Sequence, residues 1–141
     1  MTKQYYKNLA ITFFISTVWC IYVFFDYYTD QSFLSGLTLM FDFFSSSIFI
    51  IGLSIINIFL RFYFFRNLKI KRNFFYIFSG FSNILLPIIY LIYIVISNNI
   101  KEFFSSFEIT TFYICLNIIF GFIILFDLHK SILIKKKLNT E

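Results

Sequence analysis

The chain has 141 residues, of which 60% are hydrophobic and 13% are charged, and its mean hydropathy is +0.83. Soluble domains of this length are about 45–50% apolar and roughly 25% charged. A water-soluble globule is therefore excluded, because a chain this short could not bury so much apolar surface. The composition predicts a single small transmembrane domain over residues 1–141.

Phe, Ile, Tyr, Asn and Lys make up more than half of the chain, whereas Ala, Gly, Pro and Arg are scarce. The first group has AT-rich codons, so we interpret the many aromatic residues as the product of an AT-rich genome. They are expected to take the place of Leu, Val and Ala in contact with lipid, and not to form an aromatic binding cage.

Four long segments that are nearly free of charge follow one another along the chain. A helix needs about 20 apolar residues to cross roughly 30 Å of hydrocarbon. The runs are continuously apolar, without the alternation of a strand. We therefore expect an all-α membrane protein, a four-transmembrane-helix bundle, with helices at approximately 8–26, 37–61, 74–97 and 109–129. A short basic cytoplasmic tail is expected over 130–141.

The basic residues are distributed unevenly between the two predicted sides of the membrane. Eleven of the twelve Lys and Arg residues lie on the side of both termini and the 61–73 loop, and only Lys101 lies on the other. The positive-inside rule then predicts that the N-terminus and C-terminus are both cytoplasmic. The favoured location is the bacterial inner (plasma) membrane, and an organellar inner membrane is the alternative.

The same charge bias indicates what this side of the protein binds. Basic residues beside a membrane attract anionic lipids, so the net charge of +5 is not interpreted as a nucleic-acid-binding surface. The lipid bilayer, including its anionic lipids, is the expected partner of this side. The candidate anionic-lipid contacts are Arg61, Arg66, Lys69, Lys71 and Arg72.

Polar residues recur at helical spacing inside the expected spans. In the third span most of them fall within an arc of roughly 140°, and the second and fourth spans carry similar stripes. Lipid offers no hydrogen-bond partners, so these faces are expected to turn toward neighbouring helices and to place Asn57, Asn83 and Asn117 inside the bundle. The stripes either hold the helices together or line a wet path.

Asp42 is an ionisable residue within an expected span, which by default suggests a functional role. If the second helix begins near Leu37, Asp42 lies about one and a half turns inside it. If the helix begins at Asp42, the carboxylate caps it at the interface. The candidate polar or ion site comprises Asp42, Ser46, Asn57, Asn83 and Asn117. Pro87 is a candidate hinge, because it removes a backbone hydrogen bond and should kink the third helix.

No pattern typical of catalysis, of a metal site or of a cofactor occurs in the sequence, and we expect no enzyme. The leading interpretation is a non-catalytic protein that acts through helix packing with other integral membrane proteins. Such a protein is an accessory or assembly subunit of a membrane complex, or a small immunity-type protective protein. The alternative is a small homo-oligomeric channel or transporter, in which Asp42 and the polar stripes line an ion or proton path.

Overall fold

The structure is a computed structural model that describes residues 2–25, 35–63, 74–96 and 107–138, with side chains at 6–25, 38–63, 74–96 and 108–130. Over these residues the chain is all-helical, with α1 (Thr2–Val23), α3 (Ser35–Tyr63), α4 (Phe74–Ile96) and α6 (Phe107–Leu138). Each of the four helices is long and apolar enough to cross a membrane. The prediction of an all-helical chain with four helices of this length and apolarity is confirmed.

The helices differ in length from the expected spans. α1 starts at Thr2 and not near residue 8, and α6 continues to Leu138, through most of the expected tail. The length of an apolar run reflects the thickness of the hydrocarbon layer that a helix must cross. The helix itself can continue beyond that layer wherever its backbone keeps its internal hydrogen bonds. Polar and basic residues with good helix propensity therefore extend both helices beyond the apolar runs.

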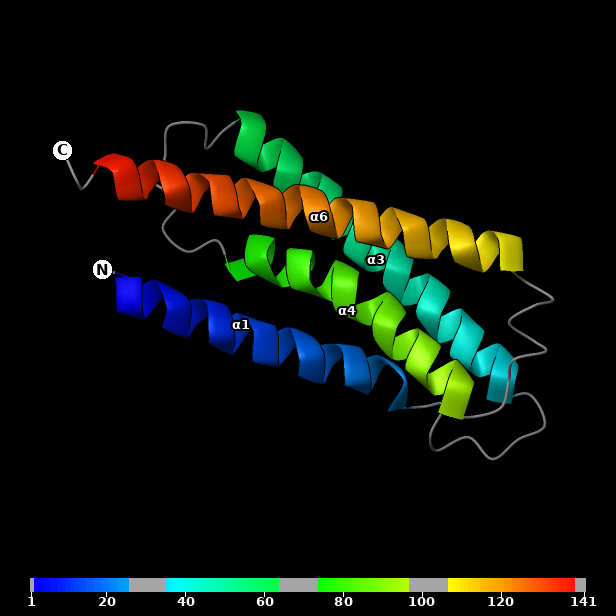
Figure 1. Cartoon of the computed structure of the whole chain (residues 1–141). Helices are drawn as coiled ribbons and strands as arrows, with labels where there is room; N and C mark the ends of the chain where they lie inside the picture. Colours follow the sequence, from blue (N-terminus) through cyan, green and yellow to red (C-terminus); the bar gives the residue numbers. More distant parts are fainter. Residues whose placement is uncertain (1, 26–34, 64–73, 97–106, 139–141) are drawn as a thin grey trace.

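α4 is the central helix of the bundle. It contacts α1, α3 and α6, and its contact with α6 is the most extensive, while α1 and α3 touch only slightly. Figure 1 shows α4 between α1 and α6, with α3 crossing both α4 and α6. The N- and C-terminal ends of the chain lie at the same end of the bundle (Figure 1). We call this the terminal end and the other the loop end.

The packing of α4 against α6 depends on two glycines. A Cβ atom on Gly80 of α4 would lie 2.7 Å from Cγ2 of Ile124, and one on Gly121 of α6 would lie 2.6 Å from Cγ1 of Ile84. Neither glycine can therefore carry a side chain unless the facing isoleucine or the helices themselves shift. Small residues allow this kind of close approach between transmembrane helices.

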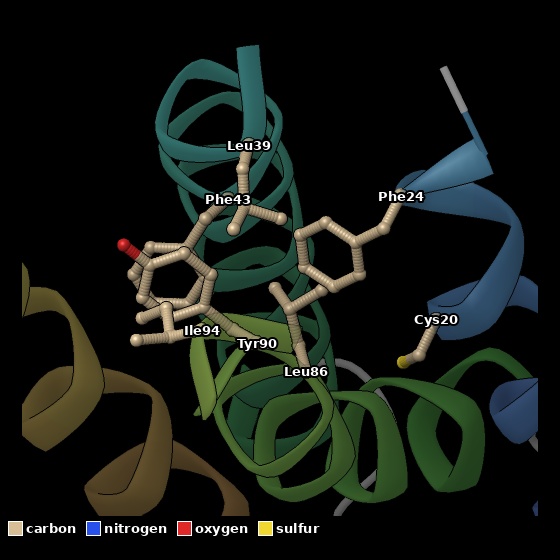
Figure 2. Packing of buried hydrophobic residues seen from close by; sticks show 7 residues of the cluster. All are labelled: Cys20, Phe24, Leu39, Phe43, Leu86, Tyr90 and Ile94. Atoms are coloured by element: carbon tan, nitrogen blue, oxygen red, sulfur yellow. The ribbon is translucent and has the colours of Figure 1, made fainter. Parts of the chain in front are cut away.

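Apolar side chains fill the bundle near both of its ends. Toward the loop end, Phe43 of α3 stacks on Tyr90 of α4 with ring centroids 4.1 Å apart, and Phe24 of α1 packs against the same tyrosine. Figure 2 shows this cluster, in which side chains of α1 and α3 converge on α4. Toward the terminal end, a second cluster joins α4 to α6 through Tyr76, Ile77, Ile124 and Leu128.

Candidate functional site

Polar side chains lie in the bundle interior, as the polar stripes predict. Asn57 is 5% exposed, and Asn83 and Asn117 are fully buried. Buried hydroxyls accompany them on α1, α3, α4 and α6. These are Thr12, Ser16, Ser47, Ser54, Ser79, Ser82 and Thr110.

Asn57 ties α3 to the first turns of α4. Its Nδ2 donates to the Phe75 carbonyl at 3.3 Å and to Ser79 Oγ at 3.5 Å. Ser79 Oγ in turn donates to the carbonyl of Tyr76 at 3.0 Å. The amide thus takes up a backbone carbonyl and a hydroxyl of the neighbouring helix, neither of which lipid could satisfy.

Asn83 makes the second polar connection between α3 and α4. Its Nδ2 donates to Ser54 Oγ at 2.6 Å and to the Ser79 carbonyl at 2.7 Å. Ser54 Oγ donates to the carbonyl of Ile50 at 2.8 Å. Both amide hydrogens of Asn83 are therefore engaged, and this fixes the direction in which its Oδ1 points.

Many of the polar side chains bond to their own helix rather than to a neighbour. Thr12 Oγ1 donates to the Asn8 carbonyl at 2.8 Å, and Asn117 Nδ2 donates to the Tyr113 carbonyl at 2.9 Å. This back-bonding satisfies a side chain without a partner helix. The polar stripes predict which faces turn inward, but only some of their residues form the interhelical bonds that we expected.

A charged group lies nearer the terminal end of the bundle, where α3, α4 and α6 meet. Arg61 Nε donates to Asp127 Oδ2, and the Tyr76 hydroxyl donates to the same oxygen at 2.9 Å. The guanidinium carbon of Arg61 lies 5.3 Å from the centroid of the Tyr76 ring. One residue from each helix thus takes part, and the two charged side chains are only 20% and 29% exposed.

This three-residue group was not expected from the sequence. The sequence predicts a contact of Arg61 with anionic lipid, whereas in the structure this residue pairs with Asp127. The available signal was an acid and a base that end two different spans on the same predicted side. The other candidate lipid contacts lie outside the described residues; they are Arg66, Lys69, Lys71 and Arg72. Binding of anionic lipid stays a prediction for these four residues and for Arg61.

Asp42 lies about two turns inside α3, because this helix begins at Ser35 and not at Asp42. The carboxylate is therefore not an N-cap, and the backbone carbonyl of Asp42 accepts a hydrogen bond from Ser45 Oγ at 3.2 Å. Asp42 and Ser46 are both partly buried. They lie on α3 before the residues that bond to Asn83, so the five candidate site residues do not form one cluster.

Pro87 is buried in α4, and the helix runs through it from Phe74 to Ile96. Proline has no N–H group, so the carbonyl of Asn83, four residues earlier, has no donor from the helix ladder. Asn83 therefore supplies both a buried polar side chain and a backbone carbonyl that receives no N–H from the helix. Whether this place acts as a hinge stays a prediction.

The outer surface of α3 carries an apolar groove and a small residue beside it. The groove has a volume of about 300 Å³ and is lined by Ile55, Ile58, Phe59, Phe62, Tyr63 and Phe120. Gly52 lies one turn before Ile55, and a Cβ atom placed on it would meet no atom of the described chain within 4 Å. This glycine contrasts with Gly80 and Gly121, which are closed in by a neighbouring helix.

Potential metal ligands and thiols are scattered over the described residues. Among them, no three His, Cys, Asp or Glu side chains come close enough together to hold a metal ion. Cys20 is buried and Cys115 is exposed on the bundle surface, and both are free thiols.

Comparison with known proteins gives no match to this chain, whether with protein-family models, curated proteins or solved structures.

Proposed function

We propose that the protein is a non-catalytic, multi-pass membrane protein that acts by packing the outer face of α3 against a transmembrane helix of another membrane protein. In this role it is an accessory or assembly subunit, or a small immunity-type protective protein. The face consists of Gly52 and the apolar groove that begins one turn later.

The contrast among the glycines carries the proposal. Small residues in membrane helices let another backbone approach closely. Gly80 and Gly121 have that neighbour within the chain, whereas the space beside Gly52 is open among the described residues. A groove lined by six apolar side chains continues from this notch, so a helix that lies against Gly52 can also seat its side chains between α3 and α6.

The polar contacts inside the bundle also support the proposal. The interhelical hydrogen bonds of Asn57 and Asn83 and the Arg61–Asp127 pair all connect helices of this chain. Polar groups that hold a bundle together are consistent with a protein whose outer surface does the recognition. Recognition by such a surface rests on shape, because its lining is apolar.

Co-purification from the native membrane tests the proposal. Wild-type protein and the variants Gly52→Leu and Ala10→Leu, each with a C-terminal tag, are extracted in mild detergent, and bound membrane proteins are quantified by mass spectrometry. Ala10 is an exposed small residue on α1 and provides the matched control. We expect a stoichiometric partner with wild type and Ala10→Leu, and at least a tenfold loss with Gly52→Leu. Recovery only as a homo-oligomer, or equal loss in both variants, contradicts the proposal.

A homo-oligomeric channel or transporter is the second candidate, and the partly buried Asp42 favours it. An acid within a membrane helix is costly and is often part of an ion or proton path. Ion flux in liposomes separates the two candidates. A conducting protein should lose flux in Asp42→Asn, whereas the partner-binding role should persist in that variant.

The membrane side remains part of this proposal. Both termini and the basic 61–73 loop are placed in the cytoplasm by the positive-inside rule, in a bacterial inner membrane or, alternatively, an organellar one. Protease accessibility of a C-terminal tag in inverted and right-side-out vesicles tests this orientation. Cleavage only in the inverted vesicles is the expected result.

A further inference from the structure

Three buried side-chain oxygens lie on the faces that α3, α4 and α6 turn toward one another. They are Ser47 Oγ, Asn83 Oδ1 and Asn117 Oδ1, and none has a hydrogen-bond partner among the described residues. A buried polar group without a partner is strongly unfavourable, especially in a membrane. If such oxygens lie at the same level of the bundle, they indicate a bound molecule that donates hydrogen bonds to them.

The contacts between α3 and α4 place Ser47 at the level of Pro87. Phe43 stacks on Tyr90 at one end of this stretch, and Ser54 bonds to Asn83 at the other. Ser47 lies one turn after Phe43 and two turns before Ser54. The two helices run in opposite directions (Figure 1), so the level of Ser47 on α4 falls between Asn83 and Tyr90, where Pro87 lies.

The contacts of α6 place Asn117 at the same level. A Cβ on Gly121 would lie 3.3 Å from Cβ of Asn83, and Asn117 precedes Gly121 by one turn of an antiparallel helix. On the α3 side, the rings of Phe44 and Tyr113 lie 5.3 Å apart, and Ser47 and Asn117 each follow about one turn later. The contacts of α6 with α4 and with α3 therefore place Asn117 at the level of Pro87 and Ser47, which we call the Pro87 layer.

Pro87 adds a fourth acceptor to this layer. The Asn83 carbonyl, which lacks a donor from Pro87, points along α4 toward its C-terminal end, as helical carbonyls do. It is therefore directed toward the level of Ser47 and Asn117. The amide hydrogens of Asn83 are already used by Ser54 and Ser79, so that residue contributes only acceptors here.

We propose that the Pro87 layer binds water inside the bundle, and that this water bridges Asn83, Asn117 and Ser47 across three helices. This inference goes beyond the proposed function and does not depend on it. Water suits the site because it donates two hydrogen bonds and is held by two to four polar partners. Polar groups that are too far apart for a direct bond are commonly bridged in this way.

A monovalent cation fits the layer less well. Its charge would need a carboxylate nearby, because an unpaired buried charge is very unfavourable. Asp127 is paired with Arg61 nearer the terminal end of the bundle. Asp42 is five residues from Ser47, which is about 140° around α3. A neutral donor is therefore the ligand that these oxygens select.

Water-edited solid-state NMR of the labelled protein in bilayers of deuterated lipid tests the proposal directly. Magnetisation should pass from water to the Nδ2 groups of Asn83 and Asn117 at short mixing times. It should not reach the backbone amide of Gly121, which lies one turn away in the tight α4–α6 contact and provides an internal control. Absence of transfer at both asparagines overturns the proposal.

Variants and salts supply a second measurement. With bridging water, Asn117→Leu lowers the unfolding midpoint in detergent and weakens the water signal at Asn83. In a dry layer, deleting an unpartnered oxygen raises the midpoint, which would overturn the proposal. The wild-type midpoint can also be compared in Na⁺ or K⁺ and in choline at equal ionic strength. A rise in Na⁺ or K⁺ that is absent in Ser47→Ala would show that the layer binds a cation, and this would also overturn the proposal. Should Asn117→Leu fail to fold, the wild-type spectrum alone decides.

Discussion

The contact between α4 and α6 gives the sharpest test of how this bundle is held together. In Gly121→Ala, the new methyl group would lie 2.6 Å from Cγ1 of Ile84 and 3.3 Å from the backbone oxygen of Gly80. Overpacking of this kind costs about 1–3 kcal/mol. The better helix propensity of Ala offsets at most about 1 kcal/mol. Subtracting that offset leaves a net loss of about 0–2 kcal/mol in the free energy of unfolding, and we expect the upper part of this range because the backbone oxygen of Gly80, which cannot rotate away, also lies within 3.3 Å.

Gly52→Ala is the matched control, because the space beside Gly52 is open among the described residues. The same substitution there should leave stability unchanged or raise it slightly. Reversible unfolding by SDS from mild-detergent micelles measures both variants. The fluorescence of Trp19, the single tryptophan, reports unfolding because its ring packs against Phe49 and Phe78 on α3 and α4. A Gly121→Ala variant as stable as wild type, or a Gly52→Ala variant that loses as much stability, would refute this packing of α4 against α6.

Three further predictions concern the other contacts of α4 and can be measured by the same unfolding titration. Asp127→Ala should lower the free energy of unfolding by about 1–2 kcal/mol, because Arg61 and the Tyr76 hydroxyl lose a shared acceptor. A double-mutant cycle with Arg61→Ala should show a coupling energy well above zero. Asn83→Ala should cost about 1–2 kcal/mol through its bond to α3, and an unchanged midpoint would refute that role. Tyr90→Ala should be the most damaging of the three, at about 3–5 kcal/mol, since it empties the buried position against Phe43; a loss below that of Asn83→Ala would argue against this packing.

Much of the architecture could be predicted from residue type and spacing alone. Charge-free runs locate the four helices, because the thickness of the hydrocarbon sets the number of apolar residues. The inward faces follow from the polar stripes, so the burial of Asn83 and Asn117 was predictable from helical periodicity. Helix ends were less predictable, as the extension of α6 to Leu138 shows, since a helix does not have to stop at the edge of an apolar run.

Pairing between helices was the harder part to predict. Periodicity places a residue on a face of its own helix, but it does not say which other helix covers that face. Arg61 and Asp127 are 66 residues apart, and only the packing of α3 against α6 brings them together. The same reason explains why Asn57 and Asn83 bond to α4 and α3, whereas Asn117 bonds back to its own helix.

The central position of α4 also bears on how a partner could be recognised. Because α4 turns its polar stripe toward α3 and α6, the polarity of the bundle is largely directed inward and little of it faces the surroundings. The surfaces that α1, α3 and α6 present outward are rich in exposed Ile and Phe, which lipid chains can cover equally well. In such a surface, selectivity for one helix over lipid has to come from shape. Under the proposed function, the open notch at Gly52 and the groove beside it are features of the described surface that can supply this shape.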